Sequence, residues 1–272
     1  MIKAFVIGHP IAHSRSPLIH GTWLKTYGIG GSYEAIDVAP EQLGDLFERL
    51  RSGEFAGGNV TIPLKEAVFS RCDSVDPLAE TIGAVNTLVA RDGRVHGLNT
   101  DFMGFLDNLD QQAPGWSTGL GSAIVLGAGG AARAILVALR QRGIGTINLL
   151  NRTPHKAEFL ARSLGGIAPG PLSSFATLAP GAGLVINTTS VGMHGTGFPD
   201  LPLARLPPTA LVTDIVYVPL ETPLLAQARR RGLRTVDGLG MLLHQAVPGF
   251  TAWFGVKPAV TPELRRTIEA TL

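Results

Sequence analysis

Three small residues near the middle of the chain, Gly127, Gly129 and Ala132, have the spacing G-x-G-x-x-A. The short apolar run before them, residues 123–126, has the length and character of a buried parallel strand. The alanine- and leucine-rich run 131–142 predicts a helix after them. A strand that turns sharply into a helix directs free backbone N–H groups and the helix dipole at a pyrophosphate. A purely structural tight turn is the alternative.

The residues at the end of the next predicted strand indicate which dinucleotide binds. An NAD site places an aspartate or glutamate about 20 residues after the glycine-rich turn, where it binds the ribose 2′-hydroxyl. This chain instead has Asn151, Arg152 and Thr153, followed by Lys156. Their amide, guanidinium, hydroxyl and ammonium groups suit the dianionic 2′-phosphate of NADP. Thr153 and Pro154 are also the expected N-cap and first residue of a helix, so Thr153 has a structural explanation too.

Two serines near the N-terminus are candidates for ligand binding. Ser14 and Ser16 follow a strand predicted over residues 2–7. Because Pro17 comes next, Ser16 is also a candidate helix cap. Ser14 has no such local explanation, and the loops after strands are where α/β proteins bind ligands.

Asn59, Thr61 and Lys65 form a second group of candidates. Asn59 and Thr61 alternate with apolar residues, which places both side chains on one face of a predicted strand. Lys65 then begins a helix, where its charge opposes the helix dipole, so local helix stability does not explain it. An isolated lysine is usually a solvated surface residue, but the two polar neighbours favour a function here.

Asn86 and Asp101 lie near the two ends of a predicted β-hairpin, residues 84–101, with Asp92-Gly93 at its turn. Asp101 also comes directly before a helical pattern. An N-cap role is therefore the alternative to a catalytic one.

The order of the other predicted elements indicates two α/β domains. Further strands are predicted over residues 32–38, 146–150, 184–187 and 211–217, with helices between them. The segment 111–121, rich in proline, serine, threonine and glycine, predicts a linker into the nucleotide-binding domain. A last helix begins near Met241 and carries Gln245. Because the nucleotide-binding pattern is complete before it, this helix is expected to return to the first domain.

Composition excludes several classes of protein. A length of 272 residues suggests about two domains, and a net charge of +2 with 16% charged residues leaves no broad basic surface for nucleic acid. No apolar stretch reaches the length of a membrane span, and residues 2–7 form a strand rather than part of a signal peptide. The single cysteine, Cys72, cannot form an internal disulfide. We therefore expect a cytoplasmic protein that binds neither membrane nor nucleic acid.

Metal and hydrolase chemistry are not expected. The seven histidines lack a metal-ligand spacing with cysteine or carboxylate partners. Ser190 is not part of a G-x-S-x-G elbow, which argues against an α/β-hydrolase.

Seven segments taken together resemble the shikimate dehydrogenase family, which reduces 3-dehydroshikimate to shikimate with NADPH. They occur in the family's order over nearly the whole chain, which is far more specific than any one motif. The segments are Ser14-Arg-Ser16-Pro17, Asn59-Val-Thr-Ile-Pro-Leu-Lys65, Gly83-Ala-Val-Asn-Thr87, Asn99-Thr-Asp101, Gly127-Ala-Gly-Gly-Ala131, Asn151-Arg-Thr153 and Asp237-Gly-Leu-Gly-Met-Leu-Leu-His-Gln245.

This resemblance implies an α/β fold of two domains. Residues 1–102 and 239–272 would form the catalytic, substrate-binding domain, and residues 103–238 a Rossmann-like, doubly wound NADP-binding domain. The C-terminal helices would return to the first domain. The implied reaction belongs to the biosynthesis of chorismate and the aromatic amino acids.

The resemblance also implies a role for each candidate residue. Lys65 and Asp101 would be the catalytic acid–base pair. The substrate would be held by Ser14, Ser16, Asn59, Thr61, Asn86, Tyr217 and Gln245. NADP would be held by Gly127, Ala128, Gly129, Gly130, Ala131, Asn151, Arg152, Thr153, Lys156, Ile215 and Gly238. The expected partners are shikimate or 3-dehydroshikimate, in a monomer or homodimer.

Two other functions remain open at this point. A quinate or quinate/shikimate dehydrogenase shares most of these motifs, although the basic residues after the second nucleotide-domain strand disfavour a version that prefers NAD. A catalytically silent NADPH-binding regulator is the alternative from a different class. Loss of the lysine or the aspartate would have favoured a regulator, and both are present.

Replacing Arg152 tests the predicted cofactor. A charge-assisted hydrogen bond to the 2′-phosphate contributes roughly 1.5–3 kcal/mol. Arg152→Ala should therefore raise the KM for NADP⁺ much more than the KM for NAD⁺ in steady-state kinetics. Equal increases for the two cofactors would contradict the assignment of Arg152 to the 2′-phosphate.

Overall fold

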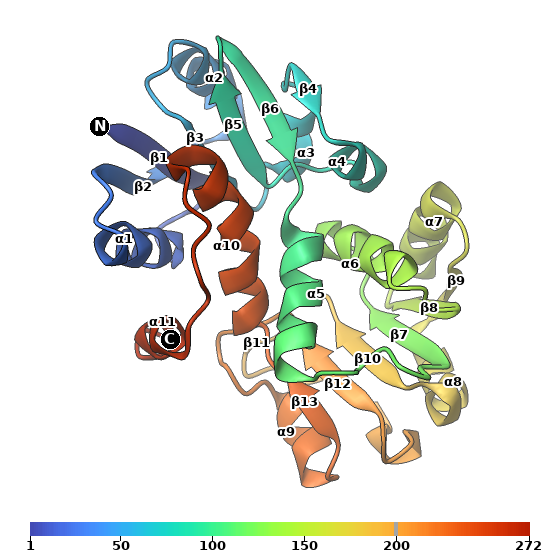
Figure 1. Ribbon diagram of the computed structural model, residues 1–272. Coiled ribbons are helices and arrows are strands. Elements are labelled where there is room, and N and C mark those ends of the chain that lie inside the picture. The colour runs from blue at the N-terminus through green and yellow to red at the C-terminus, as the bar shows by residue number, and fades with distance from the viewer. Residues whose placement is uncertain (199–200) are drawn as a thin grey trace. The chain divides into compact units, whose positions relative to one another are not determined.

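The structure, a computed structural model, describes residues 1–198 and 201–272 and divides into two compact α/β units (Figure 1). Unit 1 consists of Met1–Asp101 and Leu243–Thr271, and unit 2 contains Phe102–Leu242. The predicted divisions of the chain fall after residues 102 and 238, whereas the observed divisions fall after Asp101 and Leu242.

Unit 1 is built on a six-stranded mixed sheet in the order β2-β1-β3-β5-β6-β4. The central strand β1 pairs in parallel with β2 and β3, whereas β5 pairs antiparallel with β3 and with β6. The strands are β1 Ile2–Gly8, β2 Gly31–Asp37, β3 Gly57–Val60, β4 Ser74–Val75, β5 Thr87–Arg91 and β6 Arg94–Leu98. The helices are α1 Ser16–Thr26, η1 Pro40–Gln42, α2 Leu43–Arg51, α3 Lys65–Phe69, α4 Pro77–Ile82, α10 Leu239–Phe254 and α11 Pro262–Glu269, of which α10 enters unit 1 at Leu243.

In unit 1, the buried residues recur along each strand and helix as expected from which faces of that element are covered. Ala4, Phe5, Val6 and Ile7 of β1 are all buried, so both faces of this central strand are covered. The buried residues of α2 recur with the helical period and belong to the same core cluster as Phe5 and Ile7. These α2 residues are Leu43, Leu46, Phe47 and Leu50.

Close packing of β3 against β1 requires a glycine directly before Asn59. A Cβ atom on Gly58 would lie 2.2 Å from Cδ2 of Phe5 and 2.6 Å from the Phe5 carbonyl oxygen. Because the contact with the carbonyl oxygen involves backbone, it cannot be relieved by a side-chain rotation. The backbone that carries Asn59 is therefore held at a fixed distance from β1.

Unit 2 is built on a six-stranded sheet in the order β13-β12-β10-β7-β8-β9, and all of its strands are parallel. The order reverses between β7 and β10, as in a doubly wound sheet. Its strands are β7 Ser122–Leu126, β8 Thr146–Asn151, β9 Ala168–Pro171, β10 Leu184–Asn187, β12 Leu211–Asp214 and β13 Arg234–Val236, and β11 Val191–His194 lies outside the sheet. Its helices are α5 Asp101–Gln112, α6 Gly130–Gln141, α7 Pro154–Leu164, η2 Leu172–Ser174, α8 Phe175–Leu178, η3 Ala179–Gly181, η4 Leu203–Arg205 and α9 Pro223–Arg230.

The side chains of β7 alternate between two separate cores. Ala123 and Val125 pack with residues of α5, α6 and α7, whereas Ile124 and Leu126 pack with residues of α8 and α9. Helices therefore cover both faces of the sheet, which explains why β7 is apolar at every one of these positions. The predicted fold class, with a doubly wound unit and C-terminal helices that return to unit 1, is confirmed.

The predicted hairpin is also confirmed, but two strands are shorter than the sequence indicates. The turn residues Asp92 and Gly93 both have positive φ, of 52° and 70°, as a tight hairpin turn requires. β3 ends at Val60, so Thr61 lies just beyond it, and β12 ends at Asp214 rather than at Tyr217. The first residue after each strand still donates its N–H to the neighbouring strand, Thr61 to Ile7 and Ile215 to Asn187, but the regular pairing ends there.

The segment 111–121 is not a linker between the units. Ala113 and Trp116 belong to the core of unit 2, and the Trp116 indole N–H donates to Asp110 Oδ1 at 2.8 Å. The chain passes from unit 1 to unit 2 earlier, at Asp101–Phe102. The glycine and proline residues of this segment form turns. Because a packed loop and a linker both contain turns, the composition does not distinguish between them.

No helix within the described residues combines the length and apolarity needed to cross a membrane. The longest apolar helix, α10, has 16 residues and contains Pro248.

Gly58→Ala tests the constraint on β3. Overpacking against Phe5 should lower the free energy of unfolding by about 1–3 kcal/mol, measured by chemical denaturation. Gly44 of α2 is a matched control, because no atom lies within 4 Å of the position its Cβ would occupy. Gly44→Ala should stabilise by about 0.4–1 kcal/mol. Similar effects of the two substitutions would show that the close approach to Phe5 is not a constraint.

Candidate active site

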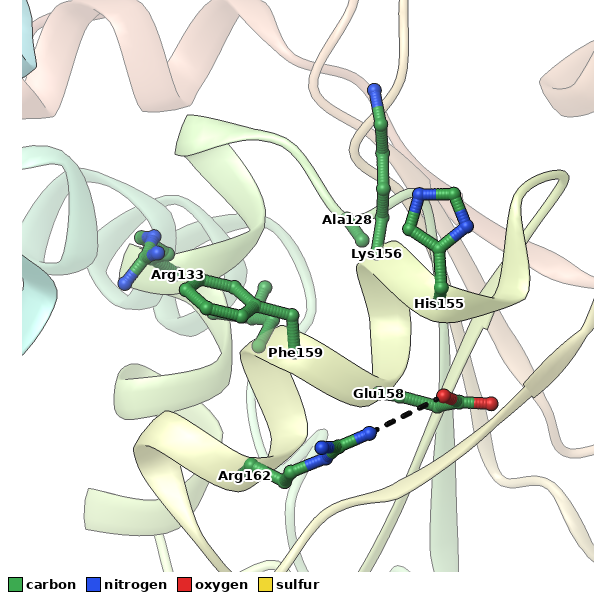
Figure 2. Close-up of a pocket in the computed structure, with 8 residues that line it drawn as sticks. Ala128, Arg133, His155, Lys156, Glu158, Phe159 and Arg162 are labelled. Carbon is green, nitrogen blue, oxygen red and sulfur yellow. Dashed lines mark hydrogen bonds and ion pairs between the residues drawn. The ribbon is translucent and has the colours of Figure 1, made fainter.

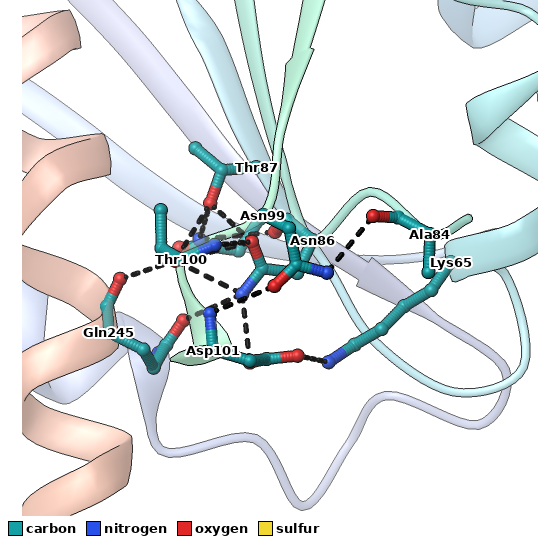
Figure 3. A network of polar contacts seen from close by, with 9 residues as sticks. Lys65, Ala84, Asn86, Thr87, Asn99, Thr100, Asp101 and Gln245 are labelled. Atoms are coloured by element: carbon teal, nitrogen blue, oxygen red, sulfur yellow. Dashed lines mark hydrogen bonds and ion pairs between the residues drawn. The ribbon is translucent and has the colours of Figure 1, made fainter. Parts of the chain in front are cut away.

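Lys65 and Asp101 form an ion pair within the polar network of unit 1 (Figure 3). Nζ of Lys65 lies 2.5 Å from Oδ2 of Asp101, and the two side chains are 25% and 11% exposed. The pair is therefore largely shielded from water but still accessible to a small ligand. Lys65 is the first residue of α3, as expected, and its carbonyl oxygen accepts a hydrogen bond from the Val85 N–H.

Asn86 holds the carboxylate of Asp101 from the other side. Its Nδ2 donates to Asp101 Oδ1 at 2.8 Å and to Thr100 Oγ1 at 3.0 Å, while its Oδ1 accepts from the Thr100 N–H at 2.8 Å. Nδ2 also lies 3.4 Å from Oε1 of Gln245, and the Thr100 hydroxyl donates to the Gln245 carbonyl oxygen at 2.8 Å. Helix α10 is thereby joined to the network that positions Asp101.

The contacts of Asp101 do not fit the alternative role of a helix cap. Asp101 is the first residue of α5, and its two carboxylate oxygens bind Lys65 and Asn86. The side chain of Asn99 accepts the Asp101 N–H at 3.1 Å and donates to the Ala84 carbonyl oxygen at 2.9 Å. Asn99 therefore provides the polar contact at this helix start.

Tyr33 orients Asn59, and the sequence gives no signal for it. The Tyr33 hydroxyl donates to Asn59 Oδ1 at 2.7 Å, and Asn59 Nδ2 donates to Thr87 Oγ1 at 3.1 Å. Thr87 in turn donates to Asn86 Oδ1 at 3.0 Å, so Asn59 belongs to the same network as Asp101. Burial raises the pKa of Tyr33 well above its usual value, against the opposing effect of a hydrogen bond with Ser16.

A buried histidine supports Tyr33. The rings of His20 and Tyr33 are stacked, with centroids 3.9 Å apart and planes 11° apart. Burial lowers the pKa of His20 to about 3, so the imidazole is neutral at physiological pH. The ring therefore packs as an aromatic group among Trp23, Phe250 and Trp253.

The remaining substrate-site candidates belong to different units. Ser16 is buried and begins α1, but Arg15 occupies the N-cap position, so Ser16 is not the cap. The Ser16 N–H donates to Ser14 Oγ at 3.3 Å, which gives Ser14 a local partner that the sequence did not predict. Thr61 is half-buried, and its N–H donates to the Ile7 carbonyl oxygen at 2.9 Å. Tyr217 is half-buried and lies in unit 2.

The glycine-rich turn of unit 2 has the geometry that a pyrophosphate needs. Gly127 has φ +103°, and a Cβ there would lie 2.4 Å from Thr189 Cγ2, so no other residue fits. Gly129 is the N-cap of α6, and neither Gly129 nor Gly130 has an atom within 4 Å of the position a Cβ would take. This turn at the start of a helix is the kind of backbone that binds a pyrophosphate, so the site fits a dinucleotide.

The residues expected to select NADP lie at the end of β8 and the start of α7. Asn151 Nδ2 donates to the Thr153 carbonyl oxygen at 2.9 Å, which folds the end of the strand into the helix. Thr153 is the N-cap and Pro154 the first residue of α7, as predicted, although the Thr153 side chain makes no capping hydrogen bond. Arg152 and Lys156 are exposed, and Lys156 lines a cavity of about 380 Å³ (Figure 2).

The loop after β12 carries Ile215 and is held from two sides. A Cβ on Gly238 would lie 2.3 Å from the Ile215 carbonyl oxygen, so Gly238 allows the two backbone segments to approach. On the other side, Asp214 Oδ1 accepts from the Val216 N–H at 2.9 Å and Oδ2 accepts from the Thr222 hydroxyl at 2.7 Å. Sequence reasoning missed Asp214, because its importance depends on these partners.

Metal chemistry has no evident site in the part of the chain that the structure describes. Residues 1–198 and 201–272 contain no group of three or more histidine, cysteine, aspartate or glutamate side chains that could hold a metal ion.

A glycine-rich turn on a doubly wound sheet, together with a lysine–aspartate pair among buried amides on a second α/β unit, defines a dinucleotide-dependent oxidoreductase. The sequence signature of the "Shikimate dehydrogenase substrate binding domain" matches residues 6–88, and that of "Shikimate / quinate 5-dehydrogenase" matches residues 116–194. The chain belongs to the shikimate dehydrogenase family.

Individual relatives match the chain over nearly its whole length. The shikimate dehydrogenase (NADP(+)) of Mesorhizobium japonicum is 56% identical over 99% of this chain and 96% of its own. The crystal structure of shikimate 5-dehydrogenase from Thermus thermophilus with NADP(H) and shikimate is 39% identical, with a TM-score of 0.89 over 100% of this chain and 99% of that one. Quinate dehydrogenase from Corynebacterium glutamicum in complex with NAD is 30% identical, with a TM-score of 0.91 over the same shares.

Asp214 should make the stability of the protein depend on pH. Burial raises its pKa to about 6 from a usual value near 3.8, while its hydrogen bonds oppose the shift. The folded state therefore binds this proton more tightly than the unfolded state. The resulting stabilisation is complete below about pH 4 and is lost as the pH rises through about 6, a difference of about 3 kcal/mol.

The measurement is the free energy of unfolding of the wild type minus that of Asp214→Asn, across pH 4–8. The amide cannot titrate, so this difference should fall as the pH rises and become constant above about pH 7. A difference that does not change with pH would contradict the raised pKa.

Proposed function

We propose that this chain catalyses the reversible, NADPH-dependent reduction of 3-dehydroshikimate to shikimate in the biosynthesis of aromatic amino acids. The observation that carries the proposal is the Lys65–Asp101 pair, which is held among amide and hydroxyl groups rather than in an apolar pocket. Such groups suit a small, flat acid with several hydroxyl groups. The chain's similarity to NADP-dependent shikimate dehydrogenases supports the same reaction.

The substrate-binding residues would divide according to the chemistry of the ligand. Ser14 and Ser16 have hydroxyl groups suited to the substrate carboxylate, with Tyr217 in support. The ring hydroxyls would be bound by Asn59, Thr61, Asn86 and Gln245. Of these, Asn59 and Asn86 are already oriented by Tyr33, Thr87 and Thr100, so little side-chain freedom is lost on binding.

Reduction of the carbonyl needs a hydride and a proton. Bound NADPH supplies the hydride. The ammonium of Lys65 would donate the proton to the developing alkoxide, and in the reverse direction the neutral amine would accept it. Asp101 would keep Lys65 Nζ in place, because its carboxylate is fixed by Asn86 and lies 2.5 Å from that nitrogen.

The cofactor would lie along the carboxyl ends of the parallel strands of unit 2. Its pyrophosphate would bind the backbone of residues 127–131, the turn that leads from β7 into α6. The 2′-phosphate would bind Asn151, Arg152, Thr153 and Lys156. Ile215 and Gly238 would line the nicotinamide.

Quinate oxidation with NAD is the main rival, because the quinate dehydrogenase of Corynebacterium glutamicum is similar over the whole chain. The residues at the end of β8 and directly after it disfavour this function, since Asn151, Arg152 and Lys156 offer an amide and two cations where an acid would bind the ribose of NAD. Measuring the rates at which the protein reduces NADP⁺ and NAD⁺, with shikimate and with quinate as substrates, decides between shikimate oxidation with NADP⁺ and quinate oxidation with NAD⁺. We expect a cytoplasmic enzyme, monomeric or homodimeric.

Lys65→Ala tests the proposed proton transfer. Positioned acid–base groups contribute about 10²–10⁴-fold to the rate, so kcat for shikimate oxidation should fall within that range. The KM values for shikimate and NADP⁺ should change only several-fold. Lys25, an exposed lysine in the last turn of α1, is the control, and Lys25→Ala should leave kcat unchanged.

Asp101→Ala should also lower kcat, and the double variant should be little worse than Lys65→Ala, because groups that act as a unit are not additive. A Lys65→Ala enzyme with near-normal kcat and only a raised KM would limit the lysine to substrate binding.

A further inference from the structure

Side-chain hydrogen bonds join the carboxyl ends of neighbouring strands in unit 2. Strands β7, β10 and β12 lie next to one another in the sheet (Figure 1), and their last residues, Leu126, Asn187 and Asp214, are in register. Asn187 and Asp214 are buried, and Asn187 Nδ2 donates to Asp214 Oδ1 at 2.8 Å. Because the strand order reverses between β7 and β10, this edge is where a doubly wound sheet binds its ligand.

Asn187 is held in one orientation by the loop that follows β10. Its Oδ1 accepts from the Thr189 N–H at 2.9 Å and from the Thr189 hydroxyl at 2.7 Å, while its Nδ2 donates to the Val191 carbonyl oxygen at 2.7 Å. An amide nitrogen has two N–H groups, and the second one is the donor to Asp214. Asn187 therefore connects Asp214 firmly to the end of β10.

Asp214 in turn holds the loop that carries Ile215 and Tyr217. Its Oδ1 also accepts from the Val216 N–H at 2.9 Å, and its Oδ2 accepts from the Thr222 hydroxyl at 2.7 Å. One carboxylate oxygen thus binds the backbone between Ile215 and Tyr217, and the other binds the residue at the far end of the loop. The buried carboxylate closes this loop.

Thr222 does more than cap a helix. It is the N-cap of α9, and its Oγ1 accepts from the Leu225 N–H at 3.4 Å. A cap requires only an oxygen that accepts a hydrogen bond. The Thr222 hydroxyl also donates to Asp214, and this second bond fixes the loop rather than the helix.

We propose that Asp214 and Thr222 are positioning residues, which hold residues 215–217 in the conformation that the nicotinamide needs. This inference rests on the proposed function, in which Ile215 lines the nicotinamide. A loop that is already fixed loses little conformational freedom when the cofactor binds, and it holds the reacting ring in a defined place. The effect is transmitted through the backbone of Val216.

Thr222→Val tests this inference, because valine has nearly the shape of threonine but lacks the hydroxyl. Binding of NADPH is measured by its fluorescence, and binding of adenosine 2′,5′-bisphosphate, which lacks the nicotinamide, is measured by calorimetry. The Kd for NADPH should rise about 3- to 10-fold, as expected for loss of one hydrogen bond, and the Kd for the bisphosphate should change less than about twofold. The kcat for shikimate oxidation should fall about 10- to 100-fold, since a misplacement of about 1 Å has effects of this size. Thr222→Ser retains the hydroxyl and should restore both NADPH binding and kcat.

Thr261→Val is the matched control for the loss of a helix cap. Thr261 is the N-cap of α11 in unit 1, its side chain accepts from the Leu264 N–H, and a proline follows it, as a proline follows Thr222. Both valine variants should lower the free energy of unfolding, because each removes a cap. Thr261→Val should leave NADPH binding and kcat unchanged.

Two results would overturn the inference. Normal NADPH binding and kcat in Thr222→Val would limit Thr222 to capping, and equal weakening of NADPH and the bisphosphate would indicate a general disturbance of unit 2. If Thr222→Val does not fold, Asp214→Asn is measured instead, since it keeps an oxygen for the Val216 N–H but directs an amide N–H at Thr222; the same contrast between the two ligands is expected, and its absence would equally overturn the inference. The proposed function would fail separately, if the wild-type protein oxidised shikimate with neither NADP⁺ nor NAD⁺.

Discussion

The hydrogen bonds of the Asn86 side chain are the interaction on which unit 1 depends. Asn86 is 2% exposed and contacts Asp101, Thr100 and Gln245, so the start of strand β5, the start of α5 and helix α10 meet at one amide. Each of these groups would cost about 1–3 kcal/mol if it were buried without a partner. Because Asn86 and Gln245 are 159 residues apart, the network is complete only when the C-terminal part of the chain returns to unit 1.

Both units place their candidate functional groups just beyond the carboxyl ends of strands. In unit 1, Lys65 follows β3 and Asp101 follows β6, and in unit 2, Gly127 follows β7 and Asn151 ends β8. Parallel strands whose helices cover both faces leave this edge as the place where loops and helix N-termini converge. The packed sheets fix the backbone, and the polar side chains at their ends are then available to bind a ligand.

Several charged residues stand where they do not favour the stability of their own helices. Lys65 begins α3, Lys156 lies in the first turn of α7 and Arg133 lies near the start of α6. Each opposes the dipole of its helix, at a cost of about 0.3–1 kcal/mol. Within unit 1, Lys65 is offset by Asp101. For Lys156, the 2′-phosphate of the proposed cofactor would provide compensation of the same kind.

Local features of this protein were determined by its sequence alone. The strand and helix around Gly127, the hairpin turn at Asp92-Gly93 and the start of α7 at Pro154 depend on neighbouring residues, whose preferences act over a few positions. The ends of β3 and β12, the packing of Trp116 and the roles of Tyr33 and Asp214 were decided by the tertiary structure. These depend on burial and on partners distant in the chain, because a strand continues only where a neighbouring strand pairs with it, and a polar side chain acquires a role only from the groups that folding brings within hydrogen-bonding distance.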